Sequence, residues 1–205
     1  MRLYLVRHGQ TVWNKANKAQ GHCDIPLDEL GQKQAERLAA QLSEVTIGRV
    51  LASDLVRCQL TLKPLLQQSS AKPEYRADLR ERTFGDMEGE DYTELHVWMR
   101  GEAVRLAVPE WEVRPPGGES MLDVWNRLTP VVEELRSETR DTLVVSHGGA
   151  LAQLLSRLIA GTHETPRAFR FSNCGITVLE KRHDGSLILV SFNNVAHLVG
   201  LDEGC

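Results

Sequence analysis

The chain of 205 residues contains 41% hydrophobic and 25% charged residues, which is typical of a globular domain and excludes a disordered or membrane-spanning chain. Its net charge of −4, with both signs mixed, lacks the basic surface of a nucleic-acid-binding protein. The N-terminal apolar run is shorter than that of a signal peptide, and no other stretch reaches transmembrane length, so we expect a cytoplasmic protein.

Four cysteines are widely spaced along the chain, at Cys23, Cys58, Cys174 and Cys205. Without a close pair such as Cys-x-x-Cys, they indicate neither a zinc site nor a dithiol redox site. None has an arginine six residues later, which a cysteine-based phosphatase needs. We therefore expect reduced, structural thiols.

The first strand is predicted at residues 3–6, a short apolar run that ends at a glycine-containing turn. Such a strand delivers Arg7 and His8 to its carboxyl end. After a polar stretch, Asp28 is the expected N-cap of a helix with Leu30, Gln34, Leu38 and Leu42 on one face.

A second buried strand is predicted at residues 49–52. Ser53 and Asp54 follow it directly, and their side chains are expected to cap the next helix. Near the start of that helix, Arg57 and Thr61 are one turn apart and therefore share a face.

The middle of the chain shows no sustained periodicity of apolar residues. An edge strand is predicted at residues 73–76, followed by a polar loop that contains Glu81. We interpret residues 86–118 as a cap-like insertion with one helix around residues 92–100. Insertions at the mouth of a site commonly act as lids and select substrates.

Glu119 and Ser120 are expected to begin one long helix, whose apolar residues recur at intervals of four and three residues. Residues 142–145 form a nearly continuous apolar run, typical of a parallel strand that is buried on both faces. A further helix follows at once. Two β-rich runs at residues 175–181 and 186–192 surround an Asp-Gly pair, which predicts a hairpin.

Alternation of strands and helices through most of the length predicts an α/β fold. We expect a three-layer α/β/α sandwich whose sheet is mostly parallel with an antiparallel edge strand. No internal repeat or low-complexity linker divides the chain. The simplest organisation is a single domain over residues 1–205, with the insertion at about 86–118.

Polar side chains follow three strands that are predicted to be parallel. Arg7 and His8 follow the first, Arg57 comes shortly after the second, and His147 with Gly148 follows the strand at 142–145. The carboxyl ends of parallel strands form the ligand crevice of an open α/β sheet, so we expect these residues to share one pocket. Glycines and helix N-termini beside them offer further backbone N–H donors.

This set of side chains suits a phosphate dianion without any metal, because arginine donates paired hydrogen bonds and keeps its charge. A neutral imidazole among arginines is a competent nucleophile, and His8 is our candidate. Glu81 is the best candidate for the acid that protonates the leaving oxygen. We expect no cofactor.

The ordered motifs resemble those of the histidine phosphatase superfamily, also called the phosphoglycerate mutase-like family. Its signatures are similar to the following blocks of this chain: Leu5-Val6-Arg7-His8-Gly9-Gln10-Thr11 with Asn14, Gln20-Gly21, Ser53-Asp54-Leu55 with Arg57 and Thr61, Leu79 and Glu81 with Phe84-Gly85 and Glu88-Gly89, Gly117-Gly118-Glu119-Ser120, and Ser146-His147-Gly148-Gly149. Gln10, Cys58 and Met87 depart from the commoner residues at positions without a catalytic role.

The resemblance implies a two-step mechanism in which His8 becomes phosphorylated. It implies that Arg7, Arg57 and His147 bind the phosphoryl group. Glu81 would protonate the leaving group and then activate water on the phosphohistidine. These implied roles agree with those assigned from the residue types alone.

The resemblance also implies that Asn14 binds phosphate and that Gln20 and Gly21 lie near the substrate. The block at residues 84–89 is similar to the phosphatase branch, because glycolytic mutases usually have a tyrosine-containing version and a longer insertion. A phosphoglycerate mutase and a non-catalytic scaffold member remain the alternatives. The candidate activities within that branch are those of broad-specificity phosphatases, α-ribazole phosphatase, and phosphatases of sugar phosphates or phosphoglycerate derivatives.

We expect a small phosphorylated metabolite as the partner, and neither nucleic acid nor membrane. An exposed sheet edge or the C-terminal hairpin leaves room for a homodimer. The substrate itself is not identified by the sequence, because the residues that would contact its non-phosphate part lie in the poorly patterned region 86–118.

Overall fold

The computed structural model describes residues 1–201. Besides short 3-10 turns, its helices and strands are β1 (Arg2–Arg7), α1 (Val12–Lys15), α2 (Glu29–Leu42), β2 (Arg49–Ser53), α3 (Val56–Gln67), β3 (Pro73–Arg76), α4 (Tyr92–Leu106), α5 (Met121–Arg127), α6 (Thr129–Ser137), β4 (Thr142–Ser146), α7 (Gly148–Leu158), β5 (Ile176–Lys181) and β6 (Leu187–Asn194). Most of the predicted strands and helices are therefore present.

The sheet has the strand order β3-β2-β4-β1-β5-β6. β1, β2, β3 and β4 pair in parallel, whereas β5 pairs antiparallel with β1 and β6 antiparallel with β5. The predicted mostly parallel α/β fold is confirmed, and its antiparallel edge consists of two strands, because the Asp184-Gly185 turn returns the chain as a hairpin.

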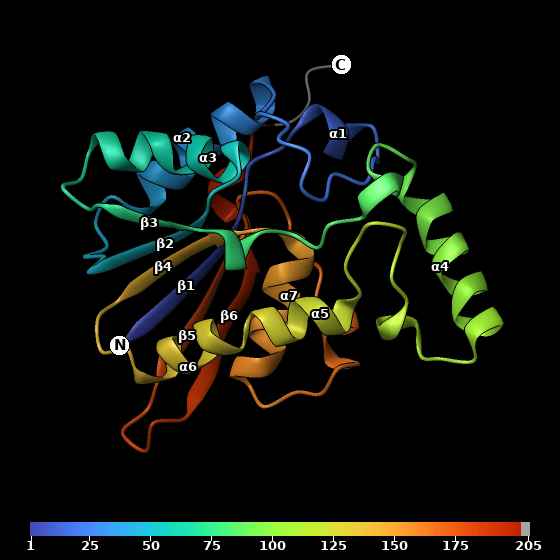
Figure 1. Ribbon diagram of the computed structural model, residues 1–205. Coiled ribbons are helices and arrows are strands. Elements are labelled where there is room, and N and C mark those ends of the chain that lie inside the picture. Colours follow the sequence, from blue (N-terminus) through green and yellow to red (C-terminus); the bar gives the residue numbers. More distant parts are fainter. Residues whose placement is uncertain (202–205) are drawn as a thin grey trace.

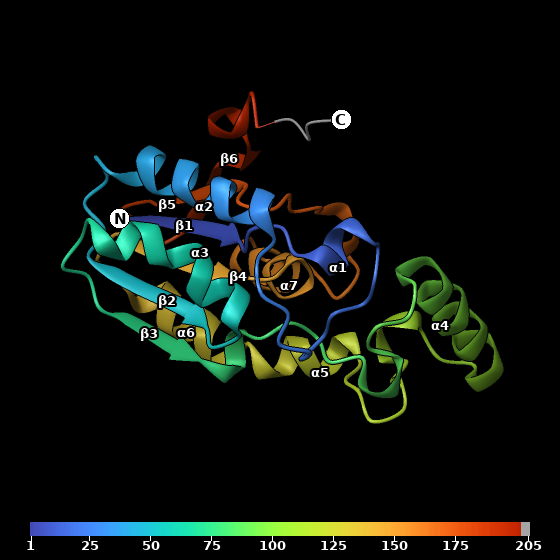
Figure 2. The same cartoon turned by 90° about the horizontal axis from the view of Figure 1, so that it is seen from above.

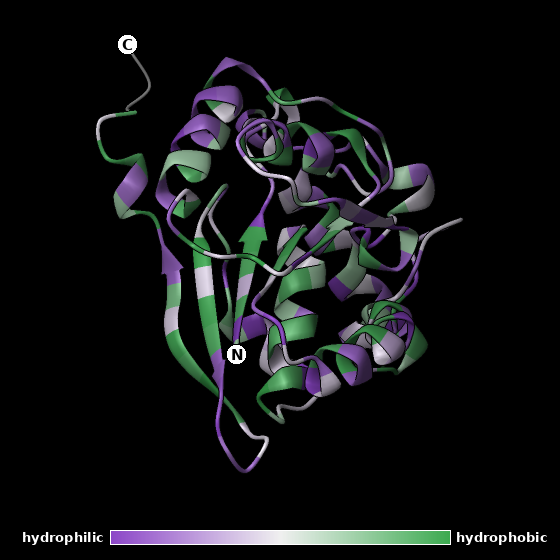
Figure 3. Ribbon diagram, turned by 90° about the vertical axis from the view of Figure 1, so that its left-hand side faces the viewer, coloured by the Kyte–Doolittle hydropathy of each residue, from purple (hydrophilic) through white to green (hydrophobic). Residues whose placement is uncertain are grey.

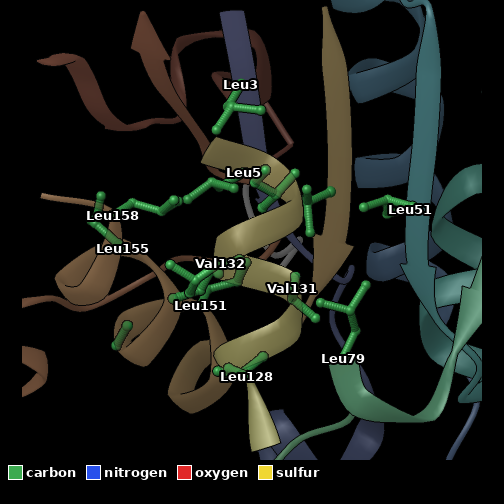
Figure 4. Packing of buried hydrophobic residues seen from close by; sticks show 14 of the residues in the cluster. Leu3, Leu5, Leu51, Leu79, Leu128, Val131, Val132, Leu151, Leu155 and Leu158 are labelled. Atoms are coloured by element: carbon green, nitrogen blue, oxygen red, sulfur yellow. The ribbon is translucent and has the colours of Figure 1, made fainter. Parts of the chain in front are cut away.

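Helices cover both faces of the sheet, with α2 and α3 on one side and α5, α6 and α7 on the other (Figures 1 and 2). Side chains alternate along β1, so Leu3 and Leu5 pack against α6 and α7 (Figure 4), whereas Tyr4 and Val6 face α2 and α3. Figure 3 shows hydrophobic residues filling the strands and hydrophilic residues dominating the exposed turns.

The prediction of one long helix after Glu119 is wrong, because this segment forms two helices, α5 and α6. Ser120 caps α5 as expected, through a reciprocal capping box with Asp123. α5 then ends, and α6 begins with Pro130 in its first turn. Proline has no N–H for the preceding turn and its ring clashes with that turn's carbonyl, so the helix breaks there.

The predicted capping of α3 by Ser53 and Asp54 is also wrong. The N-cap is Leu55, and the N–H of Val56 donates to the carboxylate of Asp24 at 2.7 Å. Asp54 instead forms an ion pair with Arg80. The short helix α1, absent from the prediction, begins at a capping box between Thr11 and Asn14.

The segment predicted as an insertion carries α4, which runs beyond the predicted residue 100 to Leu106. α4 lies past the end of the sheet, apart from both helix layers (Figures 1 and 2). Its buried Leu95 and Met99 form a small separate cluster with Phe84 and Val113. The segment thus has its own apolar contacts next to the carboxyl ends of the strands.

No helix within residues 1–201 combines the length and the apolar composition needed to cross a bilayer. Cys23, Cys58 and Cys174 are free thiols, as predicted, and Cys58 and Cys174 are buried. Cys205 lies outside the described residues.

One carboxylate, that of Glu88, joins the loop before α4 to the N-terminal loop around residues 21–23. It accepts hydrogen bonds from the backbone N–H groups of His22, Cys23 and Phe84 and from the hydroxyl of Thr83, at 2.8–3.1 Å. These bonds hold the pKa of Glu88 below its usual range against the opposing effect of burial. Two distant loops are therefore held in one arrangement by a single ionised group.

We expect Glu88→Gln to lower the free energy of unfolding by about 2 kcal/mol, because an amide NH₂ then faces one of the four donors. Urea unfolding monitored by tryptophan fluorescence measures this loss. Glu90→Gln, a substitution of an exposed neighbour, is the control and should leave stability within about 0.5 kcal/mol. Equal stability of both variants would contradict the role of Glu88.

Candidate active site

All nine residues predicted for the site line one cavity of about 800 Å³ at the carboxyl ends of β1, β2 and β4. They are Arg7, His8, Asn14, Gln20, Gly21, Arg57, Glu81, His147 and Gly148. The cavity extends to Tyr92 and His96 of α4. Six arginine and lysine side chains line it against two carboxylates, so it favours anions.

His8 is 3% exposed, and its ring is oriented by its own backbone segment. Nδ1 lies 2.7 Å from the carbonyl oxygen of Gly9. A carbonyl only accepts, so Nδ1 carries the proton and Nε2 keeps its lone pair. Burial and the charges of Arg57 and Arg7 lower the pKa of His8 well below its ordinary value of 6.5. His8 is therefore a neutral imidazole with a free Nε2.

Arg7, the last residue of β1, is half-buried, and the buried Nε of its guanidinium is an unused donor. One terminal nitrogen donates to the carbonyl of Phe171 at 2.8 Å, whereas Nε has no hydrogen-bond partner within residues 1–201. A Cβ added to Gly148 would lie 3.5 Å from this Nε, so α7 begins directly beside it. A buried N–H without a partner is costly, and an anionic ligand next to His8 satisfies it.

Arg57 on α3 is completely buried. Its guanidinium donates to the carbonyls of Gly21 and Cys23 at 2.7 and 2.8 Å, and its Nε donates to Nδ1 of His147 at 3.1 Å. Three bonds to acceptors on two segments fix the orientation of this cation, and no carboxylate within residues 1–201 forms a salt bridge with it. The positive charge is therefore left for a ligand in the cavity.

The ring of His147 follows β4 and lies 5.2 Å from the ring of His8, measured between centroids. Both of its nitrogens have partners, because Nδ1 accepts from Arg57 and Nε2 lies 2.8 Å from the hydroxyl of Ser53. Burial, followed by the charge of Arg57, lowers the pKa of His147 well below 6.5. In this arrangement His147 is neutral and orients Arg57.

The carboxylate of Glu81 lies at the N-terminus of α7. It accepts from the backbone N–H groups of Gly149 and Ala150 at 2.9 and 3.0 Å, a favourable place for negative charge. A Cβ on Gly149 would come within 2.6 Å of this carboxylate, so only glycine permits the approach. Glu81 thus lies in the same cavity as His8 and beside Gly148.

The remaining predicted residues surround this centre in different ways. Oδ1 of Asn14 accepts from Thr11 and Asn173, which leaves its NH₂ group for the cavity. Gln20 is 7% exposed and its side-chain oxygen has no partner within residues 1–201. Gly21 has a φ of +48°, and its carbonyl oxygen accepts a hydrogen bond from Arg57. Gly21 therefore acts on the site through its backbone.

Asn173 and Gln153 are two of the polar cavity residues that were not identified from the sequence. Asn173 donates to the carbonyl of His8 at 2.8 Å and reaches Asn14, which fixes the backbone of the candidate nucleophile. Gln153 of α7 is 3% exposed and lines the cavity. Neither belongs to a motif that distinguishes it from a structural amide, so local sequence carries no signal for them.

Comparison with known proteins agrees with the resemblance drawn from the motifs. Residues 3–195 match the family model of the histidine phosphatase superfamily, branch 1. Curated relatives include proteins named probable phosphoglycerate mutase GpmB. That of Proteus mirabilis is 30% identical over 99% of this chain and 98% of its own length, and that of Yersinia pestis (strain Pestoides F) is 31% identical with the same coverage.

Several solved structures similar to this chain are named as phosphatases. The α-ribazole phosphatase of Shigella flexneri has a TM-score of 0.84 and 28% identity over 95% of this chain and 96% of its own. A mycobacterial glucosyl-3-phosphoglycerate phosphatase has a TM-score of 0.78 and 29% identity over 94% and 98%. With the family model matching nearly the whole chain, this protein belongs to branch 1 of the histidine phosphatase superfamily.

Proposed function

We propose that the protein is a metal-independent phosphatase that hydrolyses a phosphate monoester of a small metabolite. The observation that carries this proposal is the state of His8, whose Nδ1–H is held by the Gly9 carbonyl while Nε2 stays unprotonated in a cationic cavity. A core histidine would need neither the free lone pair nor two arginines beside it. Phosphoryl transfer requires both.

In the first step, Nε2 of His8 attacks phosphorus and an N–P bond forms. The bond from phosphorus to the ester oxygen breaks, and that oxygen takes the electron pair and a proton from Glu81. Arg57 and the unpartnered Nε–H of Arg7 stabilise the charge on the equatorial oxygens. Of the two carboxyl groups in the cavity lining, Glu81 lies at the N-terminus of α7, next to Gly148, whereas Glu110 is paired with Arg167.

In the second step, water attacks phosphorus and gives its proton to the carboxylate of Glu81. The N–P bond breaks, its electron pair returns to Nε2, and inorganic phosphate leaves. His8 is then neutral again, as its lowered pKa favours. Each turnover consumes one phosphate ester and one water.

A phosphoglycerate mutase is the second candidate, because several curated relatives bear that name. Both activities share the first step and differ only in the acceptor of the phosphoryl group. Similar solved structures are named phosphatases, and the block at residues 84–89 favours the phosphatase branch. We therefore assign water as the acceptor.

We expect hydrolysis of p-nitrophenyl phosphate to continue in excess EDTA, because arginines supply the positive charge. His8→Ala should reduce kcat at least about 10³-fold, as the nucleophile is lost. Release of p-nitrophenolate measures both effects. His183→Ala, at an exposed position beside the β5–β6 turn, is the matched control and should remain active. Loss of activity in EDTA would contradict a metal-independent mechanism, and full turnover by His8→Ala would contradict His8 as the nucleophile.

Glu81→Gln should accumulate a phosphoenzyme, because p-nitrophenolate leaves without a proton whereas the attack of water needs the base. Rapid quenching with radiolabelled substrate should show an acid-labile label on the protein, which should be absent in His8→Ala.

A separate assay tests whether water or a substrate oxygen accepts the phosphoryl group. With 3-phosphoglycerate and a trace of 2,3-bisphosphoglycerate, the protein should release inorganic phosphate faster than it yields 2-phosphoglycerate. Faster isomerisation would instead identify a mutase.

The neutral state of His8 also predicts a pH dependence of stability. Its folded pKa lies well below 6.5, so the unfolded chain takes up a proton first as pH falls. Stability from this group is thus complete above 6.5 and is lost below it, by up to about 1.4 kcal/mol per pH unit. Between pH values of about 7.5 and 5.5, wild type should lose more stability than His8→Asn in phosphate-free buffer. Parallel losses would contradict a neutral His8.

A further inference from the structure

The loop of residues 171–175, which precedes β5, holds the two residues at the end of β1; we call it the support loop. The carbonyl of Phe171 accepts a hydrogen bond from the guanidinium of Arg7 at 2.8 Å. The amide of Asn173 donates to the backbone carbonyl of His8 at 2.8 Å. The orientation of the proposed nucleophile and of the neighbouring cation therefore depends on the position of this loop.

The support loop is held in turn by one side chain of the outermost strand, β6. Oδ1 of Asn193 accepts from the backbone N–H of Ser172 at 2.8 Å, and Nδ2 of Asn193 donates to the hydroxyl of Ser172 at 3.0 Å. The N–H of Asn193 donates to the hydroxyl of the buried Thr177 at 3.0 Å. A Cβ on Gly175 would lie 2.2 Å from Oδ1 of Asn193, so a side chain there would displace this amide.

The backbone of β6 is irregular at Asn193. Between the pairs Ile176–Asn194 and Val178–Ser191, β5 advances by two residues and β6 by three, so β6 carries one extra residue as in a β-bulge. Asn193 has a φ of +50°, which is unfavourable for most side chains and which asparagine and aspartate tolerate best. Bulges beside active sites commonly redirect a side chain, and here the redirected amide meets the support loop.

Asn193 reaches the site only through other residues. The lining of the active-site cavity includes Asn173 and His8 but not Asn193. Asn193 fixes Ser172, and the next residue, Asn173, bonds both to the carbonyl of His8 and, at 3.3 Å, to Oδ1 of Asn14. A displacement of reacting groups by about 1 Å can reduce a rate about 100-fold, so this series of contacts bears on the reaction.

We propose that Asn193 is a positioning residue for phosphoryl transfer, which acts on His8 through the support loop and Asn173. The proposal rests on the proposed phosphatase function with His8 as nucleophile. It assigns a role in that reaction to the antiparallel hairpin of β5 and β6. The parallel strands deliver the reacting side chains, whereas β6 fixes the loop that orients them.

The test begins with Asn193→Gly, which removes the amide without backbone strain because glycine adopts positive φ at no steric cost. We expect kcat/KM for p-nitrophenyl phosphate to fall about tenfold or more, and single-turnover labelling of His8 to slow in parallel. Asn193→Asp keeps an acceptor for the N–H of Ser172 and should stay within about threefold of wild type. Wild-type activity in Asn193→Gly, or equal losses in both variants, would overturn the proposal.

Asn194→Gly is the matched control on the same strand. Asn194 is exposed, and its side chain accepts locally from the N–H of Ala196 at 2.9 Å. Both glycine variants therefore lose an amide and gain the same backbone freedom. With kcat/KM measured well below the Tm of each variant, Asn194→Gly should match wild type. A loss as large as that of Asn193→Gly would indicate general loosening of the hairpin and refute a positioning role.

A double-mutant cycle tests the route to His8. If Asn193 acts through Asn173, the variant that combines Asn193→Gly with Asn173→Ala should be about as active as Asn173→Ala alone. Losses that multiply fully would show independent effects and contradict the proposed route. Labelling of His8 in wild type, measured in parallel, separates the two proposals: its absence contradicts the phosphatase mechanism, whereas normal labelling in both wild type and Asn193→Gly contradicts only the role of Asn193.

Discussion

The guanidinium of Arg57 is completely buried without a carboxylate beside it within residues 1–201, and compensating this charge determines the arrangement around it. Two carbonyls of the loop at residues 21–23 and the ring of His147 accept its N–H groups. These acceptors come from two distant parts of the chain, and Glu88 stabilises the loop that supplies two of them. A buried charge is tolerated only with such partners, so packing and site geometry depend on one another here.

Because its hydrogen-bond acceptors within residues 1–201 are all uncharged, Arg57 leaves a positive field in the cavity. That field, together with burial, lowers the pKa of His8 and keeps its Nε2 unprotonated. Nε of Arg7 has no hydrogen-bond partner within residues 1–201 and is a further donor for an anion. These features weaken the fold but favour an anion in the cavity, as expected where stability is sacrificed for binding. Glu81 completes the arrangement from the N-terminus of α7.

Local sequence patterns were sufficient for most of the fold, because apolar runs and turn residues report burial within a few residues. Local patterns failed where a helix terminus is capped by a residue that is distant in the sequence. They also failed where the buried face continues across a break between two helices. α3 is capped by Asp24, which is 32 residues from Val56, so its neighbours Ser53 and Asp54 were misleading. α5 and α6 bury one continuous apolar stripe against the sheet, so the periodicity persisted although Pro130 interrupts the backbone.

By itself, the sequence determined the chemical groups of the site, since the ordered motifs contain Arg7, His8, Arg57, Glu81 and His147 after predicted strands or in a polar loop. Only the tertiary structure decided which nitrogen of each ring is free and which unpatterned amides face the cavity. Ring orientation depends on hydrogen bonds to atoms that are brought together from distant segments. Periodicity records which face of a helix is buried, but it does not record whether a buried amide has a partner.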